Sequence, residues 1–117
     1  MKTGQDLISE AKAKVSALSV DVAKALHGTP GIVFLDVREP NEYNLGRVPG
    51  AVFIPRGQLE TNIEARVPRA TSIVVYCATD NRSALATAMM AELGYASARF
   101  MTGGFKGWAM AGNPVEG

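Results

Sequence analysis

The sequence predicts an α/β fold, an open parallel sheet of about five strands with helices on both faces. The first observation is an uncharged run of β-branched and aromatic residues, 73–76, typical of a strand buried on both faces of a parallel sheet. The second is a helical period that follows this run and ends at Gly94. Its apolar positions are Leu85, Ala86, Met89, Met90 and Leu93. The third is the alternation of strand-like and helix-like segments, which favours parallel strands joined by helical crossovers.

The N-terminal segment, residues 5–18, predicts an amphipathic helix. The apolar residues on one face of this helix are Leu7, Ala11, Val15 and Leu18. We expect residues 1–18 to form an extra helix packed on a single domain, residues 19–117. A docking surface for a protein partner is the alternative role for this helix.

The remaining elements follow from local signals in chain order. Ser19 is a favoured helix N-cap and predicts a short helix that ends at Leu26, while Gly-Thr-Pro-Gly at residues 28–31 predicts a turn. The further elements are a strand at 32–37, a helical turn at 41–45, a strand at 51–54, a helix at 59–65, the central strand, a helix at 83–93, a strand at 98–101 and a helix at 104–110. No repeat or linker interrupts this series, so one domain is expected.

The composition is that of an ordinary globular domain, with 117 residues, 47% of them hydrophobic, and a formal net charge of +1. This charge balance predicts no nucleic-acid or membrane partner. A single cysteine excludes an internal disulfide, and one cysteine with one histidine, His27, argues against a zinc site. The N-terminal residues show no signal-peptide or membrane-spanning pattern, and a free thiol fits a reducing compartment, so a cytoplasmic location is expected.

The only cysteine, Cys77, begins a loop that joins the end of the central strand to the start of the next helix. Ligands of open α/β sheets bind at this edge, and the amides of such a turn carry partial positive charge. These settings lower a cysteine pKa below its ordinary value of about 8.5. Arg82 adds a planar cation that can hold an oxyanion in two places. A lone cysteine after a buried strand is more often a core residue, but this context favours a nucleophile.

The loop, Cys-Ala-Thr-Asp-Asn-Arg at residues 77–82, resembles the active-site loop of single-domain rhodaneses, sulfurtransferases whose catalytic cysteine begins such a turn and whose arginine ends it. Two other segments resemble the same family, residues 35–55 with Leu-Asp-Val-Arg-Glu and Gly-Arg-Val-Pro-Gly-Ala, and residues 103–108 with Gly-Gly-Phe-Lys-Gly-Trp. Two departures stand out. The family usually has His-Ile where this chain has Arg47 and Val48, and glycine where it has Asp80.

This resemblance implies a sulfurtransferase that moves sulfane sulfur from a donor such as thiosulfate to cyanide or a thiol, including a protein thiol, through a persulfide on Cys77. No cofactor or metal is implied. Cys77 is the expected catalytic residue. The expected substrate-binding residues are Ala78, Thr79, Asp80, Asn81, Arg82 and Ser83.

Two polar residues, Asp36 and Arg38, fall at the same edge of the predicted sheet. They are expected to support the loop structurally, because residues two apart on a strand point the same way and can pair with neighbouring loops. Asp80 tolerates a left-handed backbone, but its charge would raise the cysteine pKa and repel an anionic donor unless it points outward or pairs with Arg82.

Three other residues are less specific signals. Arg47 could face the cleft or solvent equally well. Trp108 is expected in the core or at the cleft rim, and His27 at a helix end or idle on the surface.

Two alternatives stay open. A phosphatase or arsenate reductase of similar fold would need a longer loop than the four residues between Cys77 and Arg82. A persulfide carrier or a non-catalytic interaction module is the other alternative, since one scaffold hosts many functions.

Overall fold

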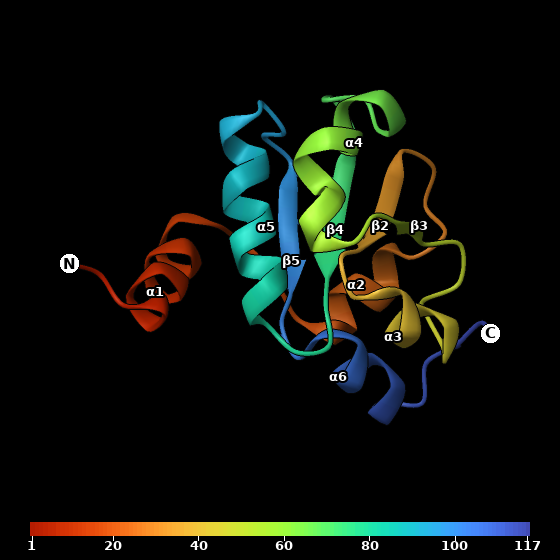
Figure 1. Ribbon diagram of the computed structural model, residues 1–117. Helices are drawn as coiled ribbons and strands as arrows, with labels where there is room; N and C mark the ends of the chain where they lie inside the picture. The colour runs from red at the N-terminus through yellow and green to blue at the C-terminus, as the bar shows by residue number, and fades with distance from the viewer.

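Strand β4 (Ser72–Tyr76) occupies the centre of a five-stranded parallel sheet in the computed structural model, which describes residues 1–117 (Figure 1). The strand order is β1-β5-β4-β2-β3. The other strands are β1 (Ala17–Leu18), β2 (Ile32–Asp36), β3 (Val52–Phe53) and β5 (Ala98–Met101). The helices are α1 (Gly4–Lys14), α2 (Val20–Leu26), α3 (Pro40–Asn44), α4 (Leu59–Arg66), α5 (Asn81–Glu92) and α6 (Gly104–Met110), with a short 3₁₀ turn at Arg56–Gln58.

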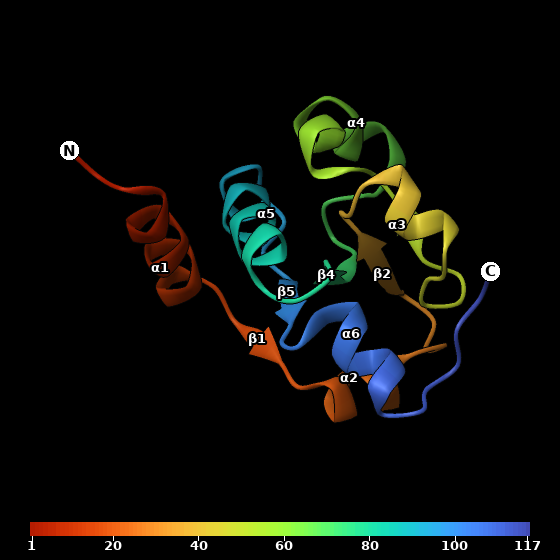
Figure 2. The same ribbon diagram turned by 60° about the horizontal axis from the view of Figure 1, so that its bottom comes forward.

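The central strand sends alternate side chains into two cores, as a strand with helices on both faces must. Ile73 and Val75 pack with residues of α4 and α5, whereas Val74 and Tyr76 pack with residues of α2 and α6. Figure 2 shows these two helix pairs on opposite sides of the sheet. Each fully buried large side chain contributes about 1.5–3 kcal/mol to folding. The predicted α/β architecture, with its parallel sheet and helices on both faces, is therefore confirmed.

The N-terminal helix is shorter than predicted. It ends at Lys14, and Val15 already has an extended backbone with φ −117° and ψ 160°. Ala17 and Leu18 instead form the edge strand β1, paired in parallel with Phe100 and Met101 of β5. The helical spacing of Leu18 was misleading because two residues carry no recognisable strand period, and the pairing with β5 decides their conformation.

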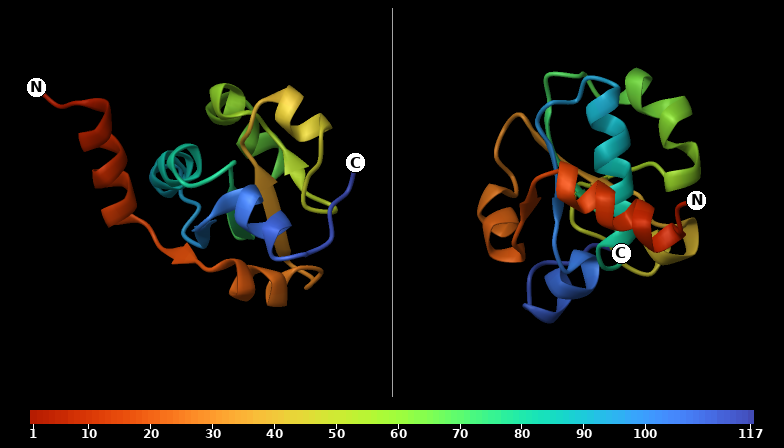
Figure 3. Two further views of the ribbon diagram at one scale, coloured as in Figure 1. Left: turned by 90° about the horizontal axis from the view of Figure 1, so that it is seen from below. Right: turned by 90° about the vertical axis from the view of Figure 1, so that its left-hand side faces the viewer.

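Helix α1 lies across α5 at one end of the molecule (Figure 3). Its Ala11 is buried, whereas Leu7 keeps 50% of its surface exposed. None of the helices is both long enough and apolar enough to cross a membrane.

Helix α5 begins two residues before the predicted start, because its first turn is polar and only the apolar residues beyond it show a period. Asp80 is the N-cap, and Asn81, Arg82 and Ser83 form the first turn. The first N–H groups of an α-helix have no acceptor inside the helix. The end of the cysteine loop is thus also the donor end of α5.

Candidate active site

The thiol of Cys77 lies directly after β4 and against the first turn of α5. Its Sγ is 3.3 Å from Oγ of Ser83, and the N–H of Ser83 donates to Sγ over the same 3.3 Å. The Ser83 hydroxyl in turn donates to the carbonyl oxygen of Asp80 at 3.0 Å. A helix N-terminal amide aimed at sulfur stabilises negative charge there. Cys77 is only 1% exposed and Ser83 is fully buried, so Ser83 contacts the nucleophile from inside the protein.

The carbonyl groups of the loop are held by helix α6. The N–H groups of Phe105 and Lys106 donate to the carbonyl oxygens of Cys77 and Ala78 at 2.8 and 3.1 Å. Gly104 has φ +56°, and a Cβ there would lie 2.4 to 2.6 Å from three carbonyl oxygens of the loop. Only glycine allows this close approach. The Gly-Gly signal of the sequence therefore corresponds to a contact between α6 and the cysteine loop.

The amide groups of the loop point the other way. In a trans peptide the C=O and the following N–H are directed oppositely, so the carbonyls held by α6 turn the amides of Ala78 and Thr79 away from it. Five successive N–H groups, from Ala78 to Arg82, donate to no acceptor in the protein, and the sixth, of Ser83, donates to sulfur. Such a series of free donors beside a thiol is suited to receive an anion or a second sulfur atom.

The Arg82 guanidinium is engaged by Glu42 of α3. Its Nη1 and Nη2 donate to Oε1 and Oε2 of Glu42 at 2.6 and 3.0 Å. These hydrogen bonds outweigh the effect of burial and hold the pKa of Glu42 down at about 2, and they raise the pKa of Arg82. No role for Glu42 was predicted from the sequence. The only signal was its place in the Arg38–Tyr43 segment, and no spacing rule links it to an arginine 40 residues later.

Asp80 does not use the left-handed backbone that was expected of a glycine replacement. Its φ of −129° and ψ of −30° are accessible to any residue, and no non-glycine residue of the chain has a positive φ. Its Oδ1 accepts the N–H of Gly103 at 2.8 Å. The carboxylate is therefore directed toward the start of α6, and it does not pair with Arg82.

Asp36 and Arg38 form a buried ion pair, with Arg38 Nη2 2.7 Å from Asp36 Oδ2 and Nε contacting both carboxylate oxygens. Arg38 also donates to the carbonyl of Gly46 at 2.7 Å, and its guanidinium lies 4.4 Å from the centre of the Phe105 ring. Burial has the largest single effect and lowers the Arg38 pKa, but the hydrogen bonds to Asp36 and the negative charges of Asp36 and Glu42 together outweigh it and raise that pKa. The pair thus contacts the helix that holds the loop, without touching Cys77 itself.

Tyr76 completes this network and was missed as a functional signal, because its sequence context indicated only a core strand. Its hydroxyl donates to Asp36 Oδ2 at 2.8 Å and accepts the N–H of Val48 at 3.1 Å. Burial, together with the nearby Asp36 carboxylate, raises the pKa of Tyr76 far above its ordinary value. A neutral tyrosine therefore links strand β4, strand β2 and the loop that precedes β3.

Arg47 faces neither the cleft nor free solvent, the two positions considered from the sequence. It pairs with Glu116 through Nε at 3.1 Å and through two backbone hydrogen bonds, so it holds the C-terminal residues against the loop before β3.

Trp108 is fully buried, as one of the two predictions for it proposed. His27 is the C-cap of α2, packs edge-on against Trp108 and bonds the Pro49 carbonyl at 2.8 Å, so it is not an idle surface residue.

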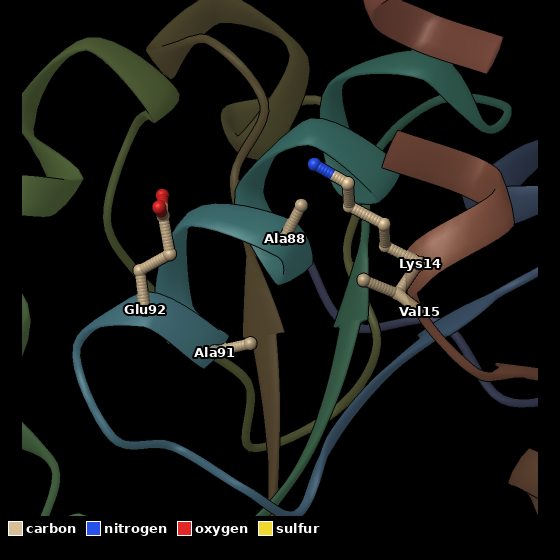
Figure 4. Close-up of a pocket in the computed structure, with 5 residues that line it drawn as sticks. All are labelled: Lys14, Val15, Ala88, Ala91 and Glu92. Carbon is tan, nitrogen blue, oxygen red and sulfur yellow. The ribbon is translucent and has the colours of Figure 1, made fainter. Parts of the chain in front are cut away.

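The two hollows of the molecule lie away from Cys77. One, of about 290 Å³, lies between α1 and α5, and Figure 4 shows the residues that line it, Lys14, Val15, Ala88, Ala91 and Glu92. The other, of about 410 Å³, lies at the amino end of β2 beside His27 and Pro49. Neither contains a loop residue. No three His, Cys, Asp or Glu side chains are grouped to hold a metal ion. The candidate site is therefore assigned from the donor groups of the loop and not from a cavity.

The chain is an α/β domain with a buried thiol at the carboxyl end of its central parallel strand, a loop of free amides after that thiol and an arginine on the next helix, so Cys77 is the candidate nucleophile. The family model described as the rhodanese-like domain matches residues 19–111. The chain therefore belongs to the rhodanese-like domain family.

Similar proteins agree with this assignment. A protein named sulfurtransferase from Allochromatium vinosum is 28% identical over 97 residues, covering 83% of this chain and 90% of the relative. A chloroplastic thiosulfate sulfurtransferase of Arabidopsis thaliana is 30% identical over 112 residues, covering 86% and 92%. A solved structure from Rhodopseudomonas palustris, described as a protein of unknown function and possible tyrosine phosphatase, has a TM-score of 0.91 at 32% identity and covers 99% and 96%. The comparisons support the sulfurtransferase class.

Proposed function

We propose that this protein moves sulfane sulfur from a small donor, such as thiosulfate, to a thiol or to cyanide through a persulfide on Cys77. The observation that carries the proposal is the series of free N–H groups from Ala78 to Arg82 in the loop that begins at the nucleophile. A persulfide places its outer sulfur among such donors, which stabilise the negative charge of that sulfur. The names of the relatives from Allochromatium vinosum and Arabidopsis thaliana point to the same chemistry.

In the first half-reaction the Cys77 thiolate attacks the outer sulfur of the donor. With thiosulfate, a sulfur–sulfur bond forms on Cys77, the donor's own sulfur–sulfur bond breaks, and sulfite leaves with the bonding electron pair. In the second half-reaction the acceptor, cyanide or a thiolate, attacks the outer sulfur of the persulfide and Cys77 leaves as thiolate. No electron acceptor is needed, because each step exchanges one nucleophile for another.

Ser83 supports the ionised state of this cycle. In the thiol form the Cys77 S–H points at the Ser83 oxygen, and the Ser83 hydroxyl donates to Asp80. Once the thiol proton has left, that hydroxyl can turn and donate to sulfur. The Asp80 carbonyl keeps a partner in the N–H of Ala84 at 2.9 Å, so this rotation leaves no buried acceptor unsatisfied.

The direct test is mass spectrometry of the intact protein after treatment with thiosulfate. One added sulfur atom is expected, removed by cyanide and absent in Cys77→Ser. If no adduct forms with thiosulfate, thiosulfonates or alkyl persulfides, the proposal is wrong, and a non-catalytic interaction module becomes the better assignment.

A phosphatase is the second candidate, because the similar Rhodopseudomonas palustris structure is described as a possible tyrosine phosphatase. Two features oppose it in this chain. Only four residues separate Cys77 from Arg82, and the arginine that would hold a phosphoryl group is bound by Glu42. Hydrolysis of an aryl phosphate that disappears in Cys77→Ser would reverse this ranking.

A further inference from the structure

The one arginine of the cysteine loop is paired with a carboxylate, which occupies two of its five N–H donors. Both terminal nitrogens of Arg82 are occupied by the two oxygens of Glu42, at 2.6 and 3.0 Å. The side chains are 36% and 28% exposed, so the pair lies at the rim of the site, beside the loop that holds the buried sulfur. A donor that approaches Cys77 therefore meets a neutral ion pair where a lone guanidinium would otherwise attract it.

Glu42 is held in this position by its own helix. Its Oε1 also accepts the N–H of Glu39 at 3.0 Å, in the reciprocal capping arrangement that starts α3, and Pro40 follows as the first helical residue. The Glu42 carboxylate is therefore placed before any substrate arrives. It is not a mobile surface side chain that a small anion displaces at no cost.

The other charges near the loop do not restore a positive site. Asp80 brings a carboxylate into the loop itself, and Glu39 is near enough to act on the Arg82 charge. Arg38 is already paired with Asp36. On the elements that bond to the loop, Lys106 is the remaining cation, and its side chain is exposed and in no ion pair.

Donors differ in the charge they bring to this site. A thiolate that attacks thiosulfate, a dianion, collects three negative charges in one place. With an organic thiosulfonate, a monoanion of the same S–SO₂ chemistry, the total is two, and with a protonated alkyl persulfide it is one. Coulomb energy grows with the product of charges, so an added carboxylate at the rim acts on the dianion twice as strongly as on the monoanion.

We infer that Glu42 is a specificity-determining residue, which neutralises Arg82 and directs the enzyme toward sulfur donors with one negative charge or none, such as thiosulfonates and alkyl persulfides. This inference rests on the proposed sulfurtransferase function. It assigns to Glu42 a choice between donors and leaves the chemical step to Cys77 and the loop amides.

The test is Glu42→Gln, which keeps the side-chain shape, the acceptor for Glu39 and one acceptor for Arg82, removes the charge, and replaces the acceptor of Arg82 Nη2 by an amide nitrogen. Activity is measured as kcat/KM with thiosulfate and with benzenethiosulfonate, using cyanide as the acceptor. We expect kcat/KM to rise about tenfold for thiosulfate and about threefold for benzenethiosulfonate, the square root, because the interaction scales with donor charge. Any effect on the ionisation of Cys77 is common to both donors and cancels in their ratio.

Two further arms separate charge from structure. Rising ionic strength screens repulsion, so wild-type kcat/KM for thiosulfate should increase with salt, and this dependence should flatten in Glu42→Gln. Glu60→Gln is the matched control, since it makes the same chemical change in another arginine pair, in which Glu60 of α4 lies 2.9 Å from Arg56 of the preceding 3₁₀ turn. That control should leave the donor ratio within twofold of wild type.

An unchanged donor ratio in Glu42→Gln, or a parallel loss with both donors, would overturn the inference and leave Glu42 a structural residue. If wild type forms no Cys77 persulfide with either donor, the sulfurtransferase function itself is wrong, and the assignment of Glu42 is lost with it. If wild type turns over both donors but the ratio of their kcat/KM values is unchanged in Glu42→Gln, only the role of Glu42 is overturned.

Discussion

The N–H of Ser83 donates to the sulfur of Cys77, and the Ser83 hydroxyl oxygen lies at the same distance, 3.3 Å. Replacement by alanine keeps the backbone donor and removes the hydroxyl. Because the hydroxyl and the N–H of Ser83 are the two groups within hydrogen-bonding distance of the sulfur, we expect Ser83→Ala to slow persulfide formation by about tenfold. The measurement is the rate of sulfur uptake by intact mass. Ser97→Ala on the exposed surface is the control, and an unchanged rate in Ser83→Ala would show that the hydroxyl plays no part.

Gly104 joins the cysteine loop to helix α6 with no room for a side chain. Gly104→Ala combines a positive φ with contacts to three carbonyl oxygens, so it should lower the free energy of unfolding by at least about 2 kcal/mol. Gly57→Ala is the matched control, since nothing lies within 4 Å of its Cβ position and its φ lies outside the left-handed range. Denaturant unfolding of both variants measures the difference. Equal stabilities would mean that α6 can move away from the loop at little cost.

The buried pair of Asp36 and Arg38 should matter far more to stability than an ion pair on the surface. Asp36→Asn leaves the Arg38 guanidinium buried without a counter-charge, and breaking such a pair costs about 3–5 kcal/mol. Glu64→Gln, which changes a pair with Arg69 that is more than half exposed on both sides, should cost less than about 1 kcal/mol. Urea unfolding at neutral pH compares the two variants. Similar losses would mean that water reaches Arg38 once its partner is neutral.

The sequence predicted the residues whose chemistry depends on neighbours in the chain, and not those positioned by the fold. Cys77 and Arg82 are five positions apart on one strand–loop–helix unit, so their position at the sheet edge followed from local periodicity. Glu42 comes from a different helix, and its pairing with Arg82 depends on where the fold places α3 relative to the first turn of α5. Tyr76 was seen as a core residue, because a strand pattern shows that a side chain is buried but not which hydrogen bonds it makes.

The same limit explains the other differences between the prediction and the structure. Strand β1 is only two residues long and exists because β5 offers a partner. Arg47 was expected at the cleft or in solvent, but Glu116, 69 residues later, determines its position. Asp80 has an ordinary backbone conformation, and its carboxylate accepts the N–H of Gly103, 23 residues later. Long-range partners of this kind leave no period in the sequence.

Glu42 also gives a pH dependence with a definite sign. Arg82 lowers the pKa of Glu42 from an ordinary value near 4.5 to about 2 in the folded protein. A lowered carboxyl pKa stabilises the folded state above the unfolded pKa, and this contribution is lost as the pH falls from about 4.5 to about 2.

Wild type should therefore exceed Glu42→Gln in unfolding free energy by about 1 kcal/mol at pH 6, a value discounted for partial exposure of the pair. This difference should vanish near pH 2. Urea titrations between pH 6 and pH 2 measure this difference, with Glu92→Gln, at an exposed position in no ion pair, as the control. A constant difference between wild type and Glu42→Gln across this range would mean that the Arg82 pair does not set the ionisation of Glu42.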